Sequence, residues 1–531
     1  MKLREGLSAL SKSSPYAVTT NLRANFPELD ALKEYLFVET DIEREFRNKI
    51  SNLAPRQILF LCGSSGDGKS EIMTRYNHQY SETIDFHLDA THSFHPKNTA
   101  IDTLDEVFSK HKKDGRPLVV GINIGMLGNY AEEGSWQHVD IRQTIKQFLN
   151  TKKADQTTCY YLDFESFPKF DLSTDVHTSD FLKQLLSKVT ANTDENPIFR
   201  MYKQGVDNGD RMLSTNYQLL SIAQVQDVIL ELLLRARLEK DQFITARSLL
   251  DFIHILLTGP DYIFDNLFNN SDNELGMKIT DFDPCAIRSK NLDMFILQRQ
   301  LELPSEDFEQ FSTDLLEFEI SYDCKKVTKY SLVRLFYLIK DLKFSNNFHH
   351  KFRQEFNNSL IGNYAKFWNL NNNYEGGLTE KAELKDFYKN VVLTSINLYA
   401  NRNATNLHKD EFFISAHGNW KLTAELELSA DYGAIKKSEE LKLGYFNAYI
   451  KVADKLLEPI PISINLLDLM YRIVRGYRPN KHDKNTVVLL DEIVDQIVEI
   501  ANASNTLYLH ADNLRIKLKQ VDKDDIEVSG V

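Results

Sequence analysis

The segment LFLCGSSGDGKSEIM, residues 59–73, constrains the fold of this chain more than any other segment. An apolar run leads into Gly63, Gly68, Lys69 and Ser70, which satisfy the pattern GxxxxGK[ST], and a helical pattern begins near Lys69. Glycines leave room for successive backbone N–H groups to turn around phosphate oxygens, and a helix that starts there adds the positive end of its dipole. The segment therefore predicts a phosphate-binding loop between a strand and a helix.

The predicted ligands of this loop are ATP and Mg²⁺. We expect Lys69 to contact the β- and γ-phosphates and the Ser70 hydroxyl to bind the metal. The residues predicted to surround the nucleotide are Gly63, Ser64, Ser65, Gly66, Asp67, Gly68, Lys69 and Ser70. The alternative is a tight turn that matches the pattern by chance. The strand before the loop and the helix after it favour nucleotide binding.

Strand and helix patterns alternate around this loop, which predicts a parallel sheet covered by helices. Strands are expected at 57–62, 83–88, 117–124 and 159–164. Helices are expected near 28–50, from about Lys69 onward, and near 99–111 and 138–149. The run PLVVGINI at 117–124 is continuously apolar up to its asparagine, as in a strand buried on both faces. From 179 to 275 only helical patterns remain, and these predict a helical lid.

We divide the chain into four predicted regions. They are a helical N-terminal segment 1–55, a P-loop NTPase core 56–178, a helical lid 179–275 and a mainly helical C-terminal region 276–531. A β insertion is expected near 411–453, where FFISA and WKLTAEL flank His417-Gly418-Asn419 and predict a hairpin. A helical pair at 463–475 and 486–503 then precedes an acidic tail. The predicted fold class is an α/β P-loop NTPase, AAA+-like, with a lid.

Hydrolysis of ATP requires carboxylates that bind Mg²⁺ and orient the attacking water. Asp89, which ends the run IDFHL, is the predicted metal ligand beside Ser70, and Glu106 is the second catalytic candidate, although its spacing is helical. Asp163 and Glu165, which end YYLDFE, are alternatives. For each of these residues, a solvated carboxylate at the end of an element is an equally simple interpretation.

A second acidic segment, VVLLDE at 487–492, has the form of an apolar strand that ends in Asp-Glu. Its apolar positions continue beyond the segment at helical spacing, with Asn485 as a cap, so we interpret it as part of an amphipathic helix.

Two further residues are predicted to act on the nucleotide. Asn123 follows the apolar run PLVVGI, and ligands of parallel sheets bind at the carboxyl ends of such strands. We expect Asn123 to contact the γ-phosphate or to position water, the alternative being a turn residue. Arg247, in the first turn of a helix expected at 245–257, is predicted to reach the nucleotide from the lid. A surface arginine is the alternative.

The charge balance limits direct contact with nucleic acid. The 63 Lys and Arg against 76 Asp and Glu give a net charge of -13, which disfavours an extended wrap of this chain around DNA. The stretch YRIVRGYRPNKHDKN, residues 471–485, is the clearest basic cluster and gives a weak prediction of nucleic-acid contact. Its predicted residues are Arg472, Arg475, Tyr477, Arg478, Lys481 and Lys484. The alternatives are a solvated loop or a charged contact with another subunit.

Cysteine usage and hydropathy indicate where a chain of this kind works. The four cysteines are far apart and have no metal-ligand spacing, and no apolar window has the length of a signal peptide core or a membrane span. We therefore expect a cytoplasmic protein without a membrane partner.

Five segments together resemble the DptF (DndF) family of DNA phosphorothioation-dependent restriction proteins. They are LSALSKSSPYAV, CGSSGDGKSE, GINIGML, ITARSLLDFI and RGYRPNKHDKNTVVLLDE. The resemblance implies an AAA+-like ATPase subunit that acts with partner subunits in a bacterial antiviral defence system, which restricts DNA lacking phosphorothioate modification. It also implies that 63–70 is the Walker A loop, that Asn123 is a sensor-1 residue and that Arg247 is a lid sensor. The chain departs from this pattern because no segment between the loop and Asn123 matches the Walker B motif.

Three functional interpretations follow. The first is an ATP-hydrolysing subunit of such a restriction complex, which meets DNA through the complex and is able to oligomerise. The second is a nucleotide-gated scaffold that binds ATP without turnover. The third, a small-molecule kinase, is disfavoured because residues 71–531 all follow the loop, whereas such kinases are compact. No metal-nuclease pattern is present, so strand cleavage is expected of a partner.

Overall fold

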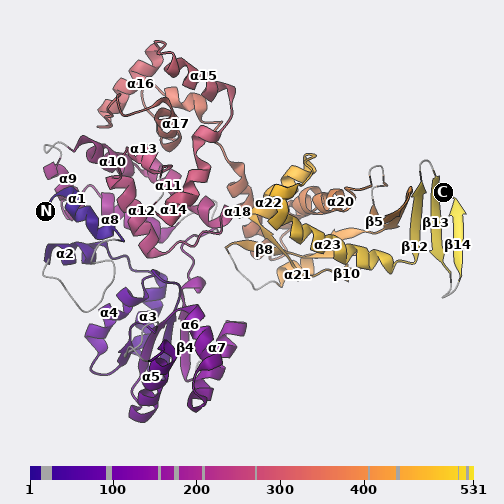
Figure 1. Cartoon of the computed structure of the whole chain (residues 1–531), viewed down its shortest axis with the longest axis horizontal. Coiled ribbons are helices and arrows are strands. Elements are labelled where there is room, and N and C mark those ends of the chain that lie inside the picture. The colour runs from indigo at the N-terminus through magenta and orange to yellow at the C-terminus, as the bar shows by residue number, and fades with distance from the viewer. Residues whose placement is uncertain are drawn as a thin grey trace. The chain divides into compact units, whose positions relative to one another are not determined.

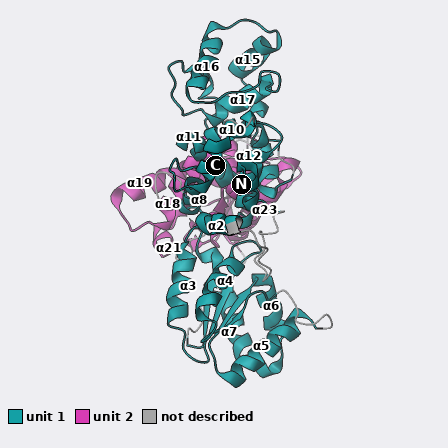
Figure 2. Ribbon diagram, turned by 90° about the vertical axis from the view of Figure 1, so that its left-hand side faces the viewer, with its two compact units in different colours: residues 1–170, 179–236, 242–357 teal, residues 171–178, 237–241, 358–531 magenta. Residues whose placement is uncertain are grey.

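In the computed structural model, the chain folds into two compact units (Figure 2). The structure describes residues 1–12, 27–90, 98–152, 157–172, 179–205, 210–269, 272–404, 407–408, 410–437, 443–511, 514–521 and 525–530. The first unit comprises residues 1–170, 179–236 and 242–357, and the second comprises 171–178, 237–241 and 358–531. The second half of the segment LSALSKSSPYAV and the predicted boundary at 178 lie outside the described residues.

A four-stranded parallel sheet forms the centre of the loop-bearing part of the first unit. Its strands are β1 (Ile58–Cys62), β2 (Asp85–His87), β3 (Leu118–Ile122) and β4 (Cys159–Asp163), in the order β2-β3-β1-β4. β1 pairs in parallel with both β3 and β4, and every residue of β1 and β3 is buried. The continuous apolar runs follow from this position, because both faces of a central parallel strand are covered. All four predicted strands are confirmed.

Helices cover both faces of this sheet (Figure 1). Ile58, Phe60 and Cys62 of β1 pack against α5 (Ala100–Asp114), α6 (Ile124–Glu133) and α7 (Val139–Thr151). Leu59 and Leu61 point the other way, towards α3 (Asp41–Ser51) and α4 (Lys69–Tyr80). Alternate side chains of a strand face opposite sides, so one five-residue strand contributes to two cores.

The rest of the first unit is helical. Its α-helices are α1 (Leu3–Leu7), α2 (Pro27–Leu36), α8 (Asp180–Thr190), α9 (Pro197–Gly205), α10 (Arg211–Ser221), α11 (Ala223–Glu239), α12 (Ala246–Thr258), α13 (Ile263–Asn266), α14 (Glu274–Ile279), α15 (Lys290–Gln300), α16 (Glu306–Glu317) and α17 (Lys329–Leu338). The last residues of α11 belong to the second unit. α1 contacts α9 and α12, whereas α3 covers the sheet. The predicted N-terminal segment 1–55 therefore contributes to two different parts of this unit.

The second unit combines helices with antiparallel sheets. Its helical elements are α18 (Ser359–Asn372), α19 (Leu378–Phe387), a π-helical turn (Tyr388–Leu393), α20 (Thr394–Ala400), α21 (Tyr432–Lys436), α22 (Ile464–Val474) and α23 (Lys484–Asn502). Its strands are β5 (Glu411–His417), β6 (Trp420–Glu425), β7 (Leu428–Ala430), β8 (Tyr445–Ala448), β9 (Ile450–Val452), β10 (Lys455–Leu456), β11 (Ile460–Ser463), β12 (Thr506–Ala511), β13 (Leu514–Gln520) and β14 (Ile526–Gly530). The predicted helical pair is confirmed as α22 and α23.

The predicted hairpin is confirmed, and it belongs to a larger sheet than expected. His417 pairs with Trp420 across a two-residue turn, in which Gly418 has a φ of 57°. The order β14-β13-β12-β6-β5 shows that β12 pairs with β6. The C-terminal segment expected as an acidic tail contains three strands that were not predicted, β12, β13 and β14, and β12 pairs with the distant strand β6. None of the helices in the described ranges is long and apolar enough to cross a bilayer.

Candidate functional site

The loop between β1 and α4 has the backbone geometry that its glycines allow. Gly66 and Gly68 have φ values of 86° and 108°, a region that side chains with a Cβ rarely occupy, and Gly68 is the N-cap of α4. Gly63 is required for space, since a Cβ there would lie 2.9 Å from the Phe164 ring and 3.1 Å from an Asp67 carboxylate oxygen. The confirmed order of strand, loop and helix directs the N-terminal end of α4 at the loop.

The Lys69 ammonium lies over the loop. Its Nζ donates to the carbonyl oxygens of Gly63 at 3.0 Å and of Ser64 at 2.7 Å. Burial lowers the pKa of Lys69, while the carboxylates of Asp67 and Asp89 act in the opposite direction. A partly buried cation held by neutral carbonyls favours an anionic ligand, and a phosphate oxygen would be a stronger acceptor than either carbonyl.

Two backbone hydrogen bonds bring the ends of three strands to the level of this loop. Gly63 N–H donates to Ile122 O at 3.3 Å, and Ala90 N–H donates to Gly121 O at 3.1 Å. Asn123, directly after β3, and Asp89, just beyond β2, therefore lie at the same carboxyl edge as the loop. This edge is where ligands of parallel sheets bind.

Asn123 is placed at the N-cap of α6, but within the described structure its side chain forms no capping hydrogen bond. Asparagine at this position usually caps the helix through its side-chain oxygen. The Asn123 carboxamide is therefore not used in capping, and its contact with a nucleotide stays a prediction.

Ser70 and Asp89 are the predicted Mg²⁺ ligands, and the structure is compatible with that role. Ser70 is in the first turn of α4, directly after Lys69, and the Asp89 carboxylate opposes the lowering of the Lys69 pKa by burial. Mg²⁺ usually takes one or two protein oxygens and completes its shell with water and phosphate. One hydroxyl and one carboxylate therefore fit this metal, and no denser cluster is required.

Glu106 is placed on α5, where its exposed carboxylate accepts a hydrogen bond from Asn98 Nδ2 at 3.1 Å. It is the seventh residue of α5, about 9 Å along the axis from the start of the helix. The neighbouring Asp105 accepts hydrogen bonds from the Tyr130 hydroxyl at 2.7 Å and from Ser135 N–H at 3.1 Å. Both side chains therefore already have hydrogen-bond partners, and a catalytic role for Glu106 stays a prediction.

Asp163, the alternative carboxylate, lies opposite Cys62 at the end of β4 and is buried. Lys152 Nζ donates to it at 2.8 Å, and Glu165 N–H donates to its other oxygen at 3.1 Å. Asp163 is therefore already paired, and a catalytic role for it stays a prediction.

The first turn of α12 touches the loop from the helical part of the unit. Arg247 N–H donates to Gly66 O at 3.1 Å, and a Cβ on Gly66 would lie 3.2 Å from both Arg247 Cβ and Thr245 Oγ1. α12 starts here because Thr245 and Ser248 form a reciprocal capping box. The backbone of Arg247 therefore contacts the loop, and the positive end of a second helix dipole lies beside it. Contact of the Arg247 side chain with a nucleotide stays a prediction.

The predicted basic cluster is only partly available to a ligand. Arg472 pairs with Asp468 at 2.9 Å and with Asp483 at 3.1 Å, and it covers the Tyr477 ring, whose hydroxyl donates to Asp483. Arg475, Arg478, Lys481 and Lys484 are exposed, and none has an ion pair with another described residue. The nucleic-acid prediction therefore depends on these four cations.

The segment VVLLDE is helical in α23, as interpreted from its spacing. Asp491 accepts hydrogen bonds from the Tyr399 hydroxyl at 2.7 Å and from Arg402 at 3.1 Å. The helix begins at Lys484, so the expected cap at Asn485 is wrong by two residues, with Asp483 at the N-cap.

Sequence reasoning missed two neighbours of the loop. Lys169 Nζ lies 3.1 Å from Asp67 Oδ1, and Phe164 covers Gly63. Both residues come from the segment after β4, which carries no motif. The available signal was topological: any segment that leaves a strand next to β1 emerges at the same edge as the loop.

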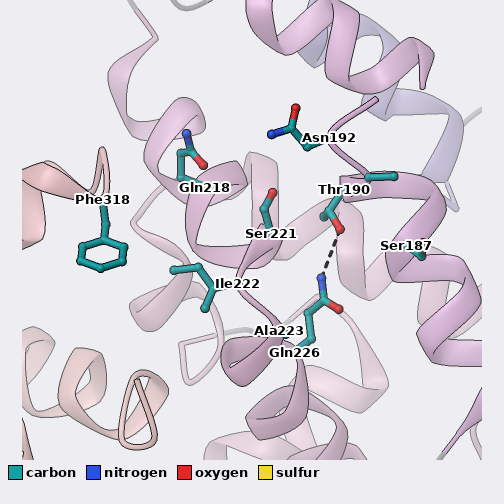
Figure 3. Close-up of a pocket in the computed structure, with 10 residues that line it drawn as sticks. Ser187, Thr190, Asn192, Gln218, Ser221, Ile222, Ala223, Gln226 and Phe318 are labelled. Carbon is teal, nitrogen blue, oxygen red and sulfur yellow. Dashed lines mark hydrogen bonds between the residues drawn. The ribbon is translucent and has the colours of Figure 1, made fainter. Parts of the chain in front are cut away.

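A separate pocket of about 500 Å³ lies among the helices of the first unit (Figure 3). Its lining residues are Ser187, Thr190, Ala191, Asn192, Gln218, Ser221, Ile222, Ala223, Gln226 and Phe318. Gln226 Nε2 donates to Thr190 Oγ1 at 3.1 Å across it. The lining has no cation, so this pocket is unsuited to a triphosphate.

Comparison of the chain with known protein families, with curated proteins and with solved structures found no match. The site is therefore interpreted from its own geometry.

Proposed function

We propose that this protein binds ATP with Mg²⁺ at the loop Gly63–Ser70 and hydrolyses it to ADP and phosphate. The observation that carries the proposal is the position of the Lys69 ammonium over a glycine loop, at the sheet edge that also holds Asp89 and Asn123. An α/β P-loop NTPase fold is part of the proposal, and the four-stranded parallel sheet with helices on both faces supports it.

In the proposed reaction, water attacks the γ-phosphorus in line with the leaving ADP oxygen. Lys69 exchanges its carbonyl partners for β- and γ-phosphate oxygens and neutralises charge that develops there. Ser70 and Asp89 would hold Mg²⁺, which would supply further charge neutralisation. The Asn123 carboxamide contacts the γ-phosphate or the attacking water.

A specific observation favours the alternative of a nucleotide-gated scaffold. Hydrolysis by this mechanism needs a second group to orient water, but Glu106 bonds to Asn98 and Asp163 is paired with Lys152. Asp67 is bound to Ser64 N–H and Lys169 within the loop, and Asp89 is already assigned to the metal. ATP binding without turnover is therefore the second candidate.

The wider role is proposed from the resemblance to the DptF (DndF) family. On this proposal the protein is an ATPase subunit of a restriction complex that acts on DNA lacking phosphorothioate modification. The contact between Gly66 and the first turn of α12 supports a link between nucleotide state and the helical part of the unit. Measurement of ATP turnover with modified and with unmodified DNA tests this role. A turnover rate that neither DNA changes would assign DNA recognition to partner subunits.

The central test is equilibrium binding of a fluorescent ATP analogue with Mg²⁺ to the purified chain. Lys69→Ala should weaken binding at least about tenfold, because it removes the cation that meets the phosphates. Lys110→Ala is the matched control, since Lys110 is an exposed lysine that pairs with Asp85, and it should leave the Kd unchanged. Absence of binding by the wild-type chain would refute the proposal.

Phosphate release separates the two candidates. Asp89→Asn should retain ATP binding and lose most of the turnover if hydrolysis occurs at this site. A wild-type chain that binds ATP and releases no phosphate would establish the scaffold.

A further inference from the structure

Asp67 gives the loop an unusual feature, a buried carboxylate within the phosphate-binding segment. Its side chain is 4% exposed. One carboxylate oxygen accepts Ser64 N–H at 2.7 Å, and the other accepts Lys169 Nζ at 3.1 Å. Lys169 is itself only 18% exposed, so both members of the pair are largely removed from water.

This carboxylate has the same sign of charge as the proposed ligand. A buried charge a few ångströms from a triphosphate is weakly screened, and one unpaired negative charge there is expected to weaken binding about tenfold or more. The loop can combine Asp67 with ATP only if a cation compensates for the carboxylate. Lys69 cannot do so once it has moved to the phosphates.

We propose that Lys169 is a positioning residue, which neutralises Asp67 and holds its carboxylate away from the phosphates. It comes from the segment after β4, just beyond the short helical turn Phe164–Ser166, and it binds the opposite oxygen from the one that Ser64 N–H occupies. The two contacts therefore fix the Asp67 side chain from two sides. This inference rests on the proposed ATP binding.

A mutant cycle separates charge compensation from simple packing. Lys169→Ala should raise the Kd for the fluorescent ATP analogue about tenfold or more, because Asp67 is left unpaired, and Lys169→Arg should restore affinity to within about threefold of wild type. Asp67→Asn removes the charge while its side-chain oxygen can still accept Ser64 N–H. In that background, Lys169→Ala should change the Kd less than about threefold.

Salt dependence provides an independent readout. The loss caused by Lys169→Ala should shrink between about 0.05 M and about 0.5 M salt, since screening weakens the repulsion, whereas a packing defect would persist. Lys146→Ala, which breaks an exposed pair with Glu132 on α6 and α7, is the matched control and should leave the Kd unchanged.

The outcomes separate this inference from the proposed function. If the wild-type chain binds ATP and Lys69→Ala abolishes binding, but Lys169→Ala leaves the Kd unchanged, the inference alone is overturned. An equal loss from Lys169→Ala in the wild-type chain and in the Asp67→Asn background would also overturn it, because the lysine would then act through packing. If Lys169→Ala does not fold, Lys169→Gln in the same two backgrounds gives the same comparison.

Discussion

Gly121 offers a sharp test of how the strand ends are assembled. It lies in β3 opposite Leu61 of β1 and has no special backbone angle, so only space demands glycine. An added Cβ would lie 2.5 Å from Met73 Sδ and 2.8 Å from Leu88 O. The thioether can shift, but the Leu88 carbonyl belongs to the backbone that carries Asp89 to the site. Gly121→Ala should therefore push β2 away from β3.

The expected cost of this overpacking is about 1–3 kcal/mol, the range for an extra methyl group in a tightly packed interior. Hydrogen exchange followed by mass spectrometry measures it locally, because exchange of buried strand amides reports the free energy of opening. The amides of β1 and β3 should exchange about fivefold to a hundredfold faster in Gly121→Ala.

Gly125→Ala is the matched control for this experiment. Gly125 lies in α6, where an added Cβ meets no atom within 4 Å, so exchange should be unchanged or slightly slower. If Gly121→Ala exchanges within about twofold of wild type, the close approach of Leu88 does not constrain the sheet, and the inferred position of Asp89 loses its support.

Two further predictions concern the helical part of the first unit. Arg334→Ala should lower stability by about 3–5 kcal/mol in urea unfolding, because it leaves the largely buried carboxylates of Asp265 and Asp283 without their cation, whereas removal of the exposed Arg353 should cost at most about 1 kcal/mol. An equal loss of stability in the two variants would contradict the conclusion that the Arg334 pairs are buried and the Arg353 pair is exposed. Burial lowers the pKa of His349 to about 4, so the unfolded chain takes up a proton that the folded chain excludes between about pH 6.5 and 4. Stability should therefore fall as pH falls through this window, by about 2 kcal/mol between pH 7 and pH 5, and His349→Gln should flatten the dependence. A wild-type slope retained in that variant would show that other groups cause it.

The part of the fold that the sequence predicted is the part with local signals. β1, the loop and α4 are contiguous, and the apolar runs of β1 and β3 reflect burial on both faces. A short stretch of sequence is therefore enough to predict each of these elements. The helical reading of VVLLDE succeeded for the same reason, since the apolar period extends through α23.

The C-terminal strands could not be predicted in the same way. β12 gains its position by pairing with β6, and Leu507 lies opposite Ala424, far away in the sequence. β14 pairs with β13, and no pattern within β14 alone indicates that partner. Strand formation here depends on context more than on composition.

In the candidate site, too, some residues could be predicted from local sequence and others could not. Loop residues and Asn123 could be predicted from the positions they take after strands, whereas Lys169 depends on which strand lies beside β1. Glu106 was chosen by residue type. Its place on an exposed face of α5 follows from the register of that helix, which the acidic pair itself does not reveal.

The contact between Gly66 and the first turn of α12 limits which fragments of this protein can keep an intact loop. A fragment that ends near the close of the sheet, before α8, would retain every residue of the glycine loop but lose the Arg247 amide that binds the Gly66 carbonyl. It would also uncover the loop surface that Thr245 shields. Affinities measured on such a fragment would describe a different binding site, so biochemical dissection should keep 1–357 together.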